Sequence, residues 1–430
     1  MTHPNPAPQP QDPQAPAAAT SDARTPGSPT PDAKTSALKA SAFLYPWDVA
    51  GDGAAASRVA DLGVRQVTLA SAYHSTRALT PRHPRHRIVT AEYAAVLYPP
   101  GEQLWQGREL RPRPAGAWVE GPDAFGTAAA ALDVAGLDVH TWVVLAHNSR
   151  MGEEHPDTTV VNAYGDRYPW APCIAHPGVR RYLVDLAAEA AVRPGARGTE
   201  LESLGWYGLA HLHAHDKIGG VPLGDAAQYL MSLCFCPHCR GGYRGLGADP
   251  DRLAAGVRRA LEPAWARGST AAGPAAVVEL LGAEPAALVL DWRTAQARSL
   301  QEEAVAAVRA AAPPGFQVLM HADPAPYHWG ANAGVDPAHI LGHVDGLVLP
   351  CTGGPEVREA MLGPTVPHAR QDTVLAANFT VVAGMGGRPA DLAADAAHAA
   401  ELGANQLRLY HAGLASDADL AAVRQVLTGS

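Results

Sequence analysis

From residue 39 onward, short apolar runs alternate along the chain with Ala-rich stretches that have helical spacing. The apolar runs are rich in Val, Leu and aromatic residues, which is typical of buried strands. Several helical stretches are followed by a glycine, such as Gly63, Gly136 and Gly403, and glycine is a favoured helix end. The predicted strands cover residues 42–48, 64–74, 139–148, 199–204, 316–323, 344–351, 373–380 and 405–411.

The main predicted helices lie between and after these strands, at residues 54–62, 125–135, 177–192, 290–311, 355–361, 389–402 and 417–427. Such alternation implies parallel strands joined by right-handed crossovers. Eight units of this kind predict an α/β protein with a (β/α)8 barrel. The rival fold is a doubly wound sheet, but no Gly-x-Gly-x-x-Gly follows the first strand.

The barrel is expected to span residues 39–430 and to carry two long loop insertions. One follows the second strand, at about residues 76–124, and is expected to be a loop with a hairpin. The other follows the fourth strand, at residues 205–290, and contains clusters of His and Cys. Residues 1–38 hold almost no large apolar side chains, so they predict a disordered tail.

The composition excludes several classes of protein. With 47% hydrophobic and 17% charged residues, the chain can build a large core. Its net charge of -9 argues against nucleic acid as a partner. No run approaches 18 apolar residues, so no membrane span is expected. The five cysteines are too few for a disulfide framework, and no secretory signal is evident, which favours the cytoplasm.

Polar and aromatic residues recur where the predicted strands end, which is the catalytic edge of such a barrel. Three carboxylates, Glu202, Asp323 and Asp48, are candidates for acid/base catalysis, because glycoside hydrolysis typically uses a pair. Each of the three could instead form an ordinary salt bridge. The candidate substrate-binding residues at these ends are Trp47, Tyr73, His74, His147, Asn148, His321, Asn378, Tyr410 and His411. Packing and structural hydrogen bonds are the alternative roles for these rings.

Two clusters in the larger insertion could hold a metal or a ligand. His211, His213 and His215 alternate, so an extended backbone would place them on one side, to bind a metal or sugar hydroxyls. The second cluster consists of Cys234, Cys236 and Cys239, to which His238 or Cys173 could add a fourth zinc ligand. A disulfide or simply buried thiols are the alternatives.

The stretch that begins Cys173-Ile-Ala-His-Pro-Gly-Val-Arg180 resembles a C-P-x-N-P-x-V-R-x-Y segment of bacterial glycoside-hydrolase-like barrel proteins. Those proteins also have a strand that ends in an acid, here Glu202, and a C-F-C-x-x-C element, here Cys234 to Cys239. The resemblance implies a sugar-directed hydrolase with Glu202 as the acid/base. The chain departs from retaining glycosidases of this fold at the seventh strand, which ends at Asn378 rather than at an acid.

The sequence therefore predicts a glycoside hydrolase that acts on a carbohydrate by carboxylate catalysis and requires no cofactor, with a structural zinc at the cysteines. One alternative is a metal-dependent lyase, isomerase or hydrolase that uses the histidine cluster. The other is a carbohydrate-binding barrel without catalysis.

Overall fold

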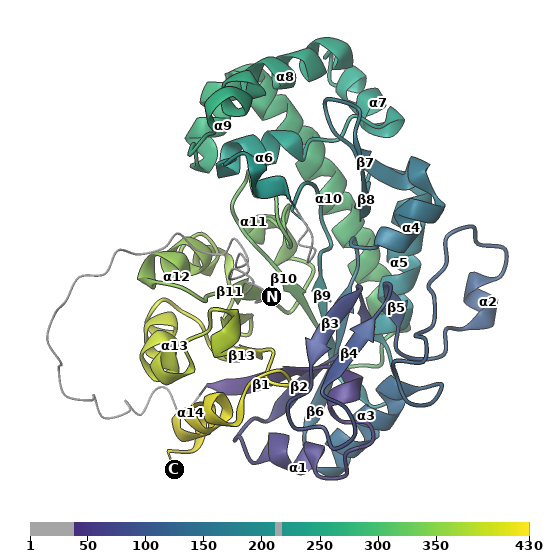
Figure 1. Ribbon diagram of the computed structural model, residues 1–430, viewed down its shortest axis with the longest axis vertical. Coiled ribbons are helices and arrows are strands. Elements are labelled where there is room, and N and C mark those ends of the chain that lie inside the picture. Colours follow the sequence, from purple (N-terminus) through teal and green to yellow (C-terminus); the bar gives the residue numbers. More distant parts are fainter. Residues whose placement is uncertain (1–37, 211–216, 430) are drawn as a thin grey trace, which may run out of the picture.

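Eight parallel strands close into a barrel in the computed structural model, which describes residues 38–210 and 217–429 (Figure 1). β1 pairs with both β2 and β13, so the ring is complete and the predicted (β/α)8 barrel is confirmed. The eight barrel strands are β1 (Lys39–Leu44), β2 (Gln66–Tyr73), β6 (Asp138–Val144), β9 (Ala196–Glu202), β10 (Gln317–His321), β11 (Gly346–Pro350), β12 (Val374–Thr380) and β13 (Gln406–Tyr410).

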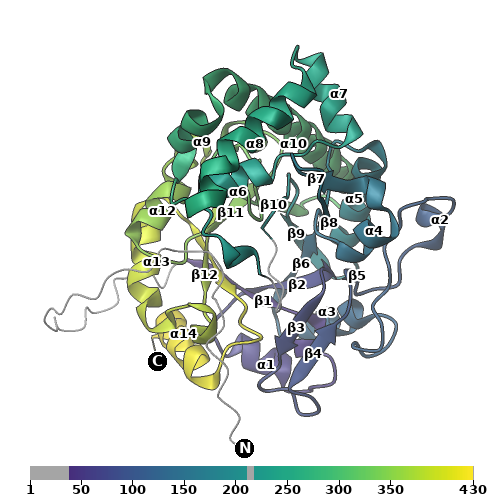
Figure 2. The ribbon, with the colours of Figure 1, turned by 45° about the horizontal axis from the view of Figure 1, so that its top comes forward.

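Helices follow the barrel strands and pack around them (Figures 1 and 2). The outer helices are α1 (Ala55–Ala60), α3 (Ala124–Val134), α5 (Pro177–Ala191), α10 (Ala283–Ala311), α11 (Pro337–Ile340), α12 (Pro355–Leu362), α13 (Leu392–Glu401) and α14 (Asp417–Thr428). The start of α5 shows how local sequence sets a boundary. Pro177 occupies its first turn, and His176 accepts hydrogen bonds from the backbone N–H groups of Gly178 and Val179.

Three insertions lie at the carboxyl-terminal ends of the barrel strands. After β2, a β3–β4 hairpin (Thr76–Leu79, Ile88–Ala91) confirms the expected one, and β5 (Ala95–Val96) and α2 (Glu102–Trp105) follow it. After β6 come α4 (Ser149–Glu154) and the β7–β8 hairpin (Thr159–Val161, Arg167–Pro172). After β9, a helical group lies at one end of the molecule (Figure 1). Its helices are α6 (Asp225–Met231), α7 (Pro237–Gly245), α8 (Pro250–Arg267) and α9 (Gly273–Leu281).

The helical insertion has a hydrophobic core of its own, which includes the four clustered cysteines and the β7–β8 hairpin. It is tied to that hairpin by a hydrogen bond of 2.6 Å from Phe235 N–H to the carbonyl of Val161. Because the two insertions share this core, residues from the loops after β6 and β9 lie side by side.

Several boundaries differ from the sequence-based expectation, two of them by a wide margin. Residues 149–173, which lie between a predicted strand and a predicted helix, contain α4 and the β7–β8 hairpin. The long helix starts at Ala283 rather than near Leu290, because its first turns bury Ala286 and Val289 in the core of the insertion.

Within the described ranges no single helix is long and apolar enough to cross a membrane. Only α9 and α10 taken together reach the required length and apolar composition, and they meet at an angle of 118°. The predicted tail, residues 1–38, falls almost entirely outside the described part of the chain.

Candidate functional site

Glu202 closes β9 at the mouth of the barrel, among aromatic and histidine side chains. Its Oε2 accepts a hydrogen bond of 2.6 Å from Nε1 of Trp142, a fully buried residue of β6. Nδ1 of His321, at the end of β10, lies 4.0 Å from the same oxygen. The Glu202 side chain keeps 13% of its surface exposed, so it is held on one side and reachable on the other.

A buried pair of opposite charges lies one layer deeper, on the inner side of the same strand. Oε1 of Glu200 is 2.6 Å from Nε of Arg408 on β13 and accepts a hydrogen bond of 3.1 Å from the Thr68 hydroxyl. Oε2 of Glu200 faces Nε2 of His321 at 3.5 Å. Burial raises the pKa of Glu200, but Arg408 and His321 outweigh it and lower the pKa to about 2. Glu200 is therefore ionised, and His321 lies between two carboxylates.

The sequence-based prediction did not include Glu200 and Arg408, although the sequence indicates that both are unusual. Both are charged residues inside runs that otherwise read as barrel strands, Thr199-Glu-Leu-Glu202 and Gln406-Leu-Arg-Leu-Tyr410. Charged residues are almost never fully buried unless they are paired. Opposite charges on two inward-facing strand positions of one barrel indicate such a pair.

A series of aromatic rings in contact extends from beside Glu202. Tyr73 contacts Trp142 at 4.6 Å and His74 at 4.2 Å between ring centroids. His74 continues to His147 at 4.6 Å, and His147 to Tyr207 at 5.0 Å. The structure thus brings together three predicted residues from the ends of β2 and β6, and adds Tyr207, which the sequence did not single out.

The far side of the mouth is formed by the ends of β1 and β13. Tyr410 contacts His411 at 3.6 Å, and His411 lies 5.4 Å from Tyr45, which stacks on Trp47 at 4.5 Å. Burial lowers the pKa of His411 to about 3 and also lowers the pKa of His74, so both rings are neutral at pH 7. Burial raises the pKa of Tyr45 and Tyr73, which stay protonated and can donate hydrogen bonds.

The other two candidate carboxylates have no hydrogen bond or ion pair with Glu202 among the described residues. Asp323 follows β10 and accepts from the N–H of Ala325 at 2.9 Å, and its Oδ2 lies 3.4 Å from Nδ1 of His328. Asp48 accepts from the N–H of Tyr45 at 2.8 Å and lines a cavity with Arg82 and Gly413, toward α1 and α14. The catalytic roles of both stay predictions.

The two candidate asparagines lie in different settings, and one of them caps a helix. Asn148 is the N-cap of α4 and accepts from the N–H of Met151 at 3.0 Å. Asn378 pairs in register with Arg408 across β12 and β13, and its side-chain oxygen is buried without a hydrogen-bond partner.

His211, His213 and His215 lie outside the described residues, so the predicted roles of this cluster stay predictions.

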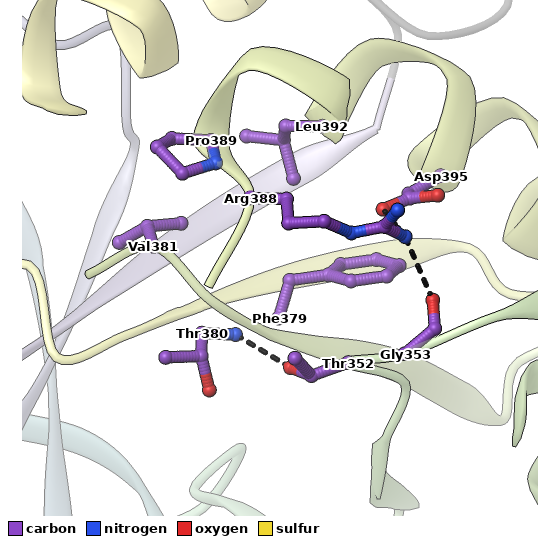
Figure 3. A pocket seen from close by; sticks show the side chains of 9 residues that line it. All are labelled: Thr352, Gly353, Phe379, Thr380, Val381, Arg388, Pro389, Leu392 and Asp395. Carbon is purple, nitrogen blue, oxygen red and sulfur yellow. Dashed lines mark hydrogen bonds and ion pairs between the residues drawn. The ribbon is translucent and has the colours of Figure 1, made fainter. Parts of the chain in front are cut away.

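A small cavity lies beside the ends of β11 and β12 (Figure 3). Arg388 donates a hydrogen bond of 3.0 Å to the carbonyl of Gly353 there, and the N–H of Thr380 donates one of 2.8 Å to the hydroxyl of Thr352. Its volume of about 10 Å³ is at the lower limit for a single water molecule. This cavity is too small for a sugar.

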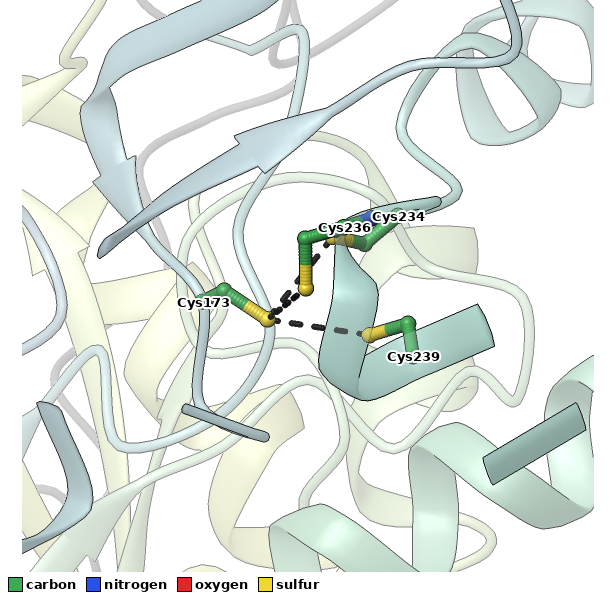
Figure 4. Close-up of side chains that lie close together, drawn as sticks. All are labelled: Cys173, Cys234, Cys236 and Cys239. Atoms are coloured by element: carbon green, nitrogen blue, oxygen red, sulfur yellow. Dashed lines mark hydrogen bonds between the residues drawn. The ribbon is translucent and has the colours of Figure 1, made fainter. Parts of the chain in front are cut away.

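The four cysteines expected to hold a metal converge into one buried cluster (Figure 4). Cys173 follows β8, whereas Cys234, Cys236 and Cys239 lie at the start of α7. The Cys173 sulfur is 3.6 Å from those of Cys236 and Cys239 and 3.7 Å from that of Cys234. Disulfide sulfurs are about 2.05 Å apart, so the thiols are free. The fourth member is Cys173 rather than His238, whose ring packs against His176.

The cluster fits a tetrahedral metal ion. Zinc–sulfur bonds of about 2.3 Å in a tetrahedron place neighbouring sulfurs about 3.8 Å apart, close to the distances observed. The N–H of Cys236 also lies 3.5 Å from the Cys234 sulfur, as expected for a backbone group that stabilises a thiolate. Hydrogen bonds from the other three thiols lower the pKa of Cys236 and so favour its thiolate form.

The chain matches no family model and no curated protein. Solved structures do share its fold. The PgaB (BpsB) glycoside hydrolase domain from Bordetella bronchiseptica is 16% identical with a TM-score of 0.51, over 91% of this chain and 99% of that one. The catalytic domain of β-amylase from Paenibacillus polymyxa is 11% identical with a TM-score of 0.53, over 91% and 99%.

A β-galactosidase from the psychrophilic Marinomonas ef1 is 10% identical with a TM-score of 0.52. The match covers 91% of this chain and 59% of that one. At such identities these likenesses establish a shared (β/α)8 architecture and nothing finer.

Proposed function

We propose that this protein is a glycoside-hydrolase-like enzyme that acts on a carbohydrate at the mouth of the barrel, with Glu202 as the general acid/base. The observation that carries the proposal is the setting of Glu202. It ends a barrel strand, accepts from Trp142 at 2.6 Å, and has a partly exposed side chain. The similarity of the fold to glycoside hydrolases supports it.

In this proposal Glu202 donates its proton to the glycosidic oxygen as the bond to the anomeric carbon breaks. Asp323 is the better placed of the two candidate partners, because it follows β10, which pairs directly with β9. It would remove the proton from the attacking water or form the glycosyl intermediate. Glu200 is buried behind His321 and does not reach the substrate. Its charge holds the His321 ring beside Glu202.

Neutral rings at the mouth suit an uncharged or weakly charged sugar. His74 and His411 are neutral and can donate and accept hydrogen bonds with hydroxyl groups. Tyr410 is half-buried and can present a ring to a sugar face. Trp47, another candidate substrate-binding residue, is 3% exposed and stacks on Tyr45.

The test is hydrolysis of a panel of aryl glycosides and oligosaccharides by the wild type and by Glu202→Gln. Loss of a general acid/base typically costs about 10²- to 10⁴-fold in rate. Glu189→Gln is the matched control, because Glu189 also accepts from a tryptophan, Trp105 at 2.9 Å, but lies on α5. If pure wild type hydrolyses no glycoside but is stabilised by a sugar, the carbohydrate-binding alternative is supported instead.

We also propose that the four cysteines hold a structural zinc, which joins the insertion after β9 to the loop after β6. The sulfur distances and the burial of all four residues support this. With four protein ligands the ion would have no open position, so its contribution is to the fold and not to the chemistry. Elemental analysis of the purified chain tests the proposal, and one zinc per chain is expected.

A further inference from the structure

Arg293, on α10, is a buried cation without a counter-charge among the described residues. It is 6% exposed, and its guanidinium lies over the rings of Trp206 at 4.5 Å and Tyr229 at 4.9 Å. One terminal nitrogen donates to the carbonyl of Ser232 at 3.3 Å. The other, Nη1, is buried and has no hydrogen-bond partner. No carboxylate of residues 38–210 or 217–429 forms an ion pair with it.

A buried charge without compensation is costly, commonly by several kcal/mol. A guanidinium in such a place therefore calls for a negative group nearby. Arg293 lines a cavity together with Cys173, Cys234 and Cys239. A zinc ion with four thiolates has a net charge of -2, since four thiolate charges exceed the two positive charges of the ion. The cluster would supply the charge that Arg293 lacks.

We propose that Arg293 is the counter-charge of the zinc–thiolate site and strengthens zinc binding. This inference rests on the structural zinc proposed above. The guanidinium stabilises the deprotonated sulfurs, which are the form that binds metal. The cavity of about 30 Å³ has room for little more than a water molecule, and the thiolates would repel a bound anion. Arg293 is thus better matched to the cluster than to a separate ligand.

The experiment measures the zinc affinity of the full chain by competition with a chromophoric chelator under reducing conditions. Loss of an outer-shell partner typically weakens metal binding by about 10- to 100-fold, and this is expected for Arg293→Met. Arg293→Lys keeps the charge and should lose less. Arg358→Met is the control, because Arg358 is also buried, at 3% exposed, but pairs with Asp395. Its zinc affinity should equal that of the wild type.

A second readout distinguishes the charge from the shape of the side chain. Without metal, Arg293 is an unpaired buried cation, so metal-free Arg293→Met should melt at the same temperature as the wild type or higher. With zinc bound, Arg293→Met should melt at a lower temperature than the zinc-bound wild type. Cobalt-loaded Arg293→Met should keep a thiolate-to-cobalt absorption band, which would show that the four ligands are intact. Arg293→Gln replaces Arg293→Met if that variant does not fold.

Equal zinc affinity in the wild type and Arg293→Met would overturn the proposal while leaving the zinc site in place. A wild type that binds neither zinc nor cobalt would overturn both. A third outcome would show an anion site instead. In that outcome acetate or chloride stabilises the metal-free wild type but not metal-free Arg293→Met, and the two proteins bind zinc equally well.

Discussion

Nε of Arg408 lies 2.6 Å from Oε1 of Glu200 across the inside of the barrel, and both side chains are fully buried. The two residues are on β13 and β9, which are not neighbours in the ring. Their pairing connects opposite parts of the barrel beneath the mouth and holds His321 on the other oxygen of Glu200. The ion pair thus helps to position His321, which lies beside Glu202, the proposed acid/base.

Removal of one partner of this pair should destabilise the protein strongly. Arg408→Met leaves the Glu200 charge buried and unpaired, which typically costs about 3 to 5 kcal/mol. The double variant Glu200→Leu/Arg408→Met leaves no unpaired charge and should recover much of this loss. Urea denaturation of the three proteins measures the difference. A double variant no more stable than Arg408→Met would contradict the account.

Trp142→Phe should reduce glycoside hydrolysis more than it reduces stability. It removes the 2.6 Å hydrogen bond from the indole N–H to the Glu202 carboxylate but keeps a ring beside Tyr73. A hydrogen bond to a charged group contributes about 1.5 to 3 kcal/mol, or roughly 10- to 150-fold in rate if it is needed in the transition state. Initial rates measure the effect. Trp105→Phe, which loses the equivalent bond to Glu189, should keep its activity.

Asp48→Asn should make stability less dependent on pH. Burial raises the pKa of Asp48 from 3.8 to about 7, although the Tyr45 N–H and Arg82 act to lower it. Between these values the unfolded chain loses the proton first, so this residue reduces stability as pH rises from about 4 to 7. At about 1.4 kcal/mol per pKa unit, the effect is bounded at about 4 kcal/mol. Asn should therefore stabilise the protein at pH 8 and not at pH 3.5.

Thermal unfolding at several pH values measures this effect of Asp48. Equal stabilisation by Asn at both extremes would show that Asp48 is not the titrating group.

Zinc removal should lower the melting temperature, because bound metal stabilises the fold that binds it. Cys236→Ser should lose the metal and melt like the metal-free wild type. Cys351→Ser is the matched control, because Cys351 is also fully buried but lies apart from the cluster, at the end of β11. Elemental analysis and thermal unfolding decide the outcome. Retention of full metal content by Cys236→Ser would contradict the assignment.

Asn332→Gly should destabilise the turn that follows Glu202. The next residue, Ser203, has a left-handed backbone with φ of 55°, and its N–H donates to Oδ1 of Asn332 at 3.0 Å. Asn332 is itself left-handed, with φ of 65°, so glycine fits the backbone and only the acceptor is lost. An unpaired buried N–H costs about 1 to 3 kcal/mol. Asn332→Asp keeps the acceptor and should lose less. Urea denaturation compares the three.

The sequence by itself determined the architecture and several of the residues at the barrel mouth. Strands and helices have local hydrophobic periods, which are visible within a short stretch of sequence. Every predicted barrel strand is present in the structure. Because parallel strands all end at one edge, Tyr73, His74, His147 and Glu202 could be expected near one another. Cys234, Cys236 and Cys239 could be grouped because metal ligands follow few spacing patterns.

Only the tertiary structure decided which side chains touch. Glu200 and Arg408 are 208 positions apart, and their pairing depends on the register and closure of the whole barrel. The register of β6 against β9 places Trp142 against Glu202, and Asp48 lies toward Arg82 and Gly413. Cys173 joins the other cysteines because two insertions share a core. Periodicity fixes which face a residue lies on, but contacts between distant strands depend on distances that no local pattern contains.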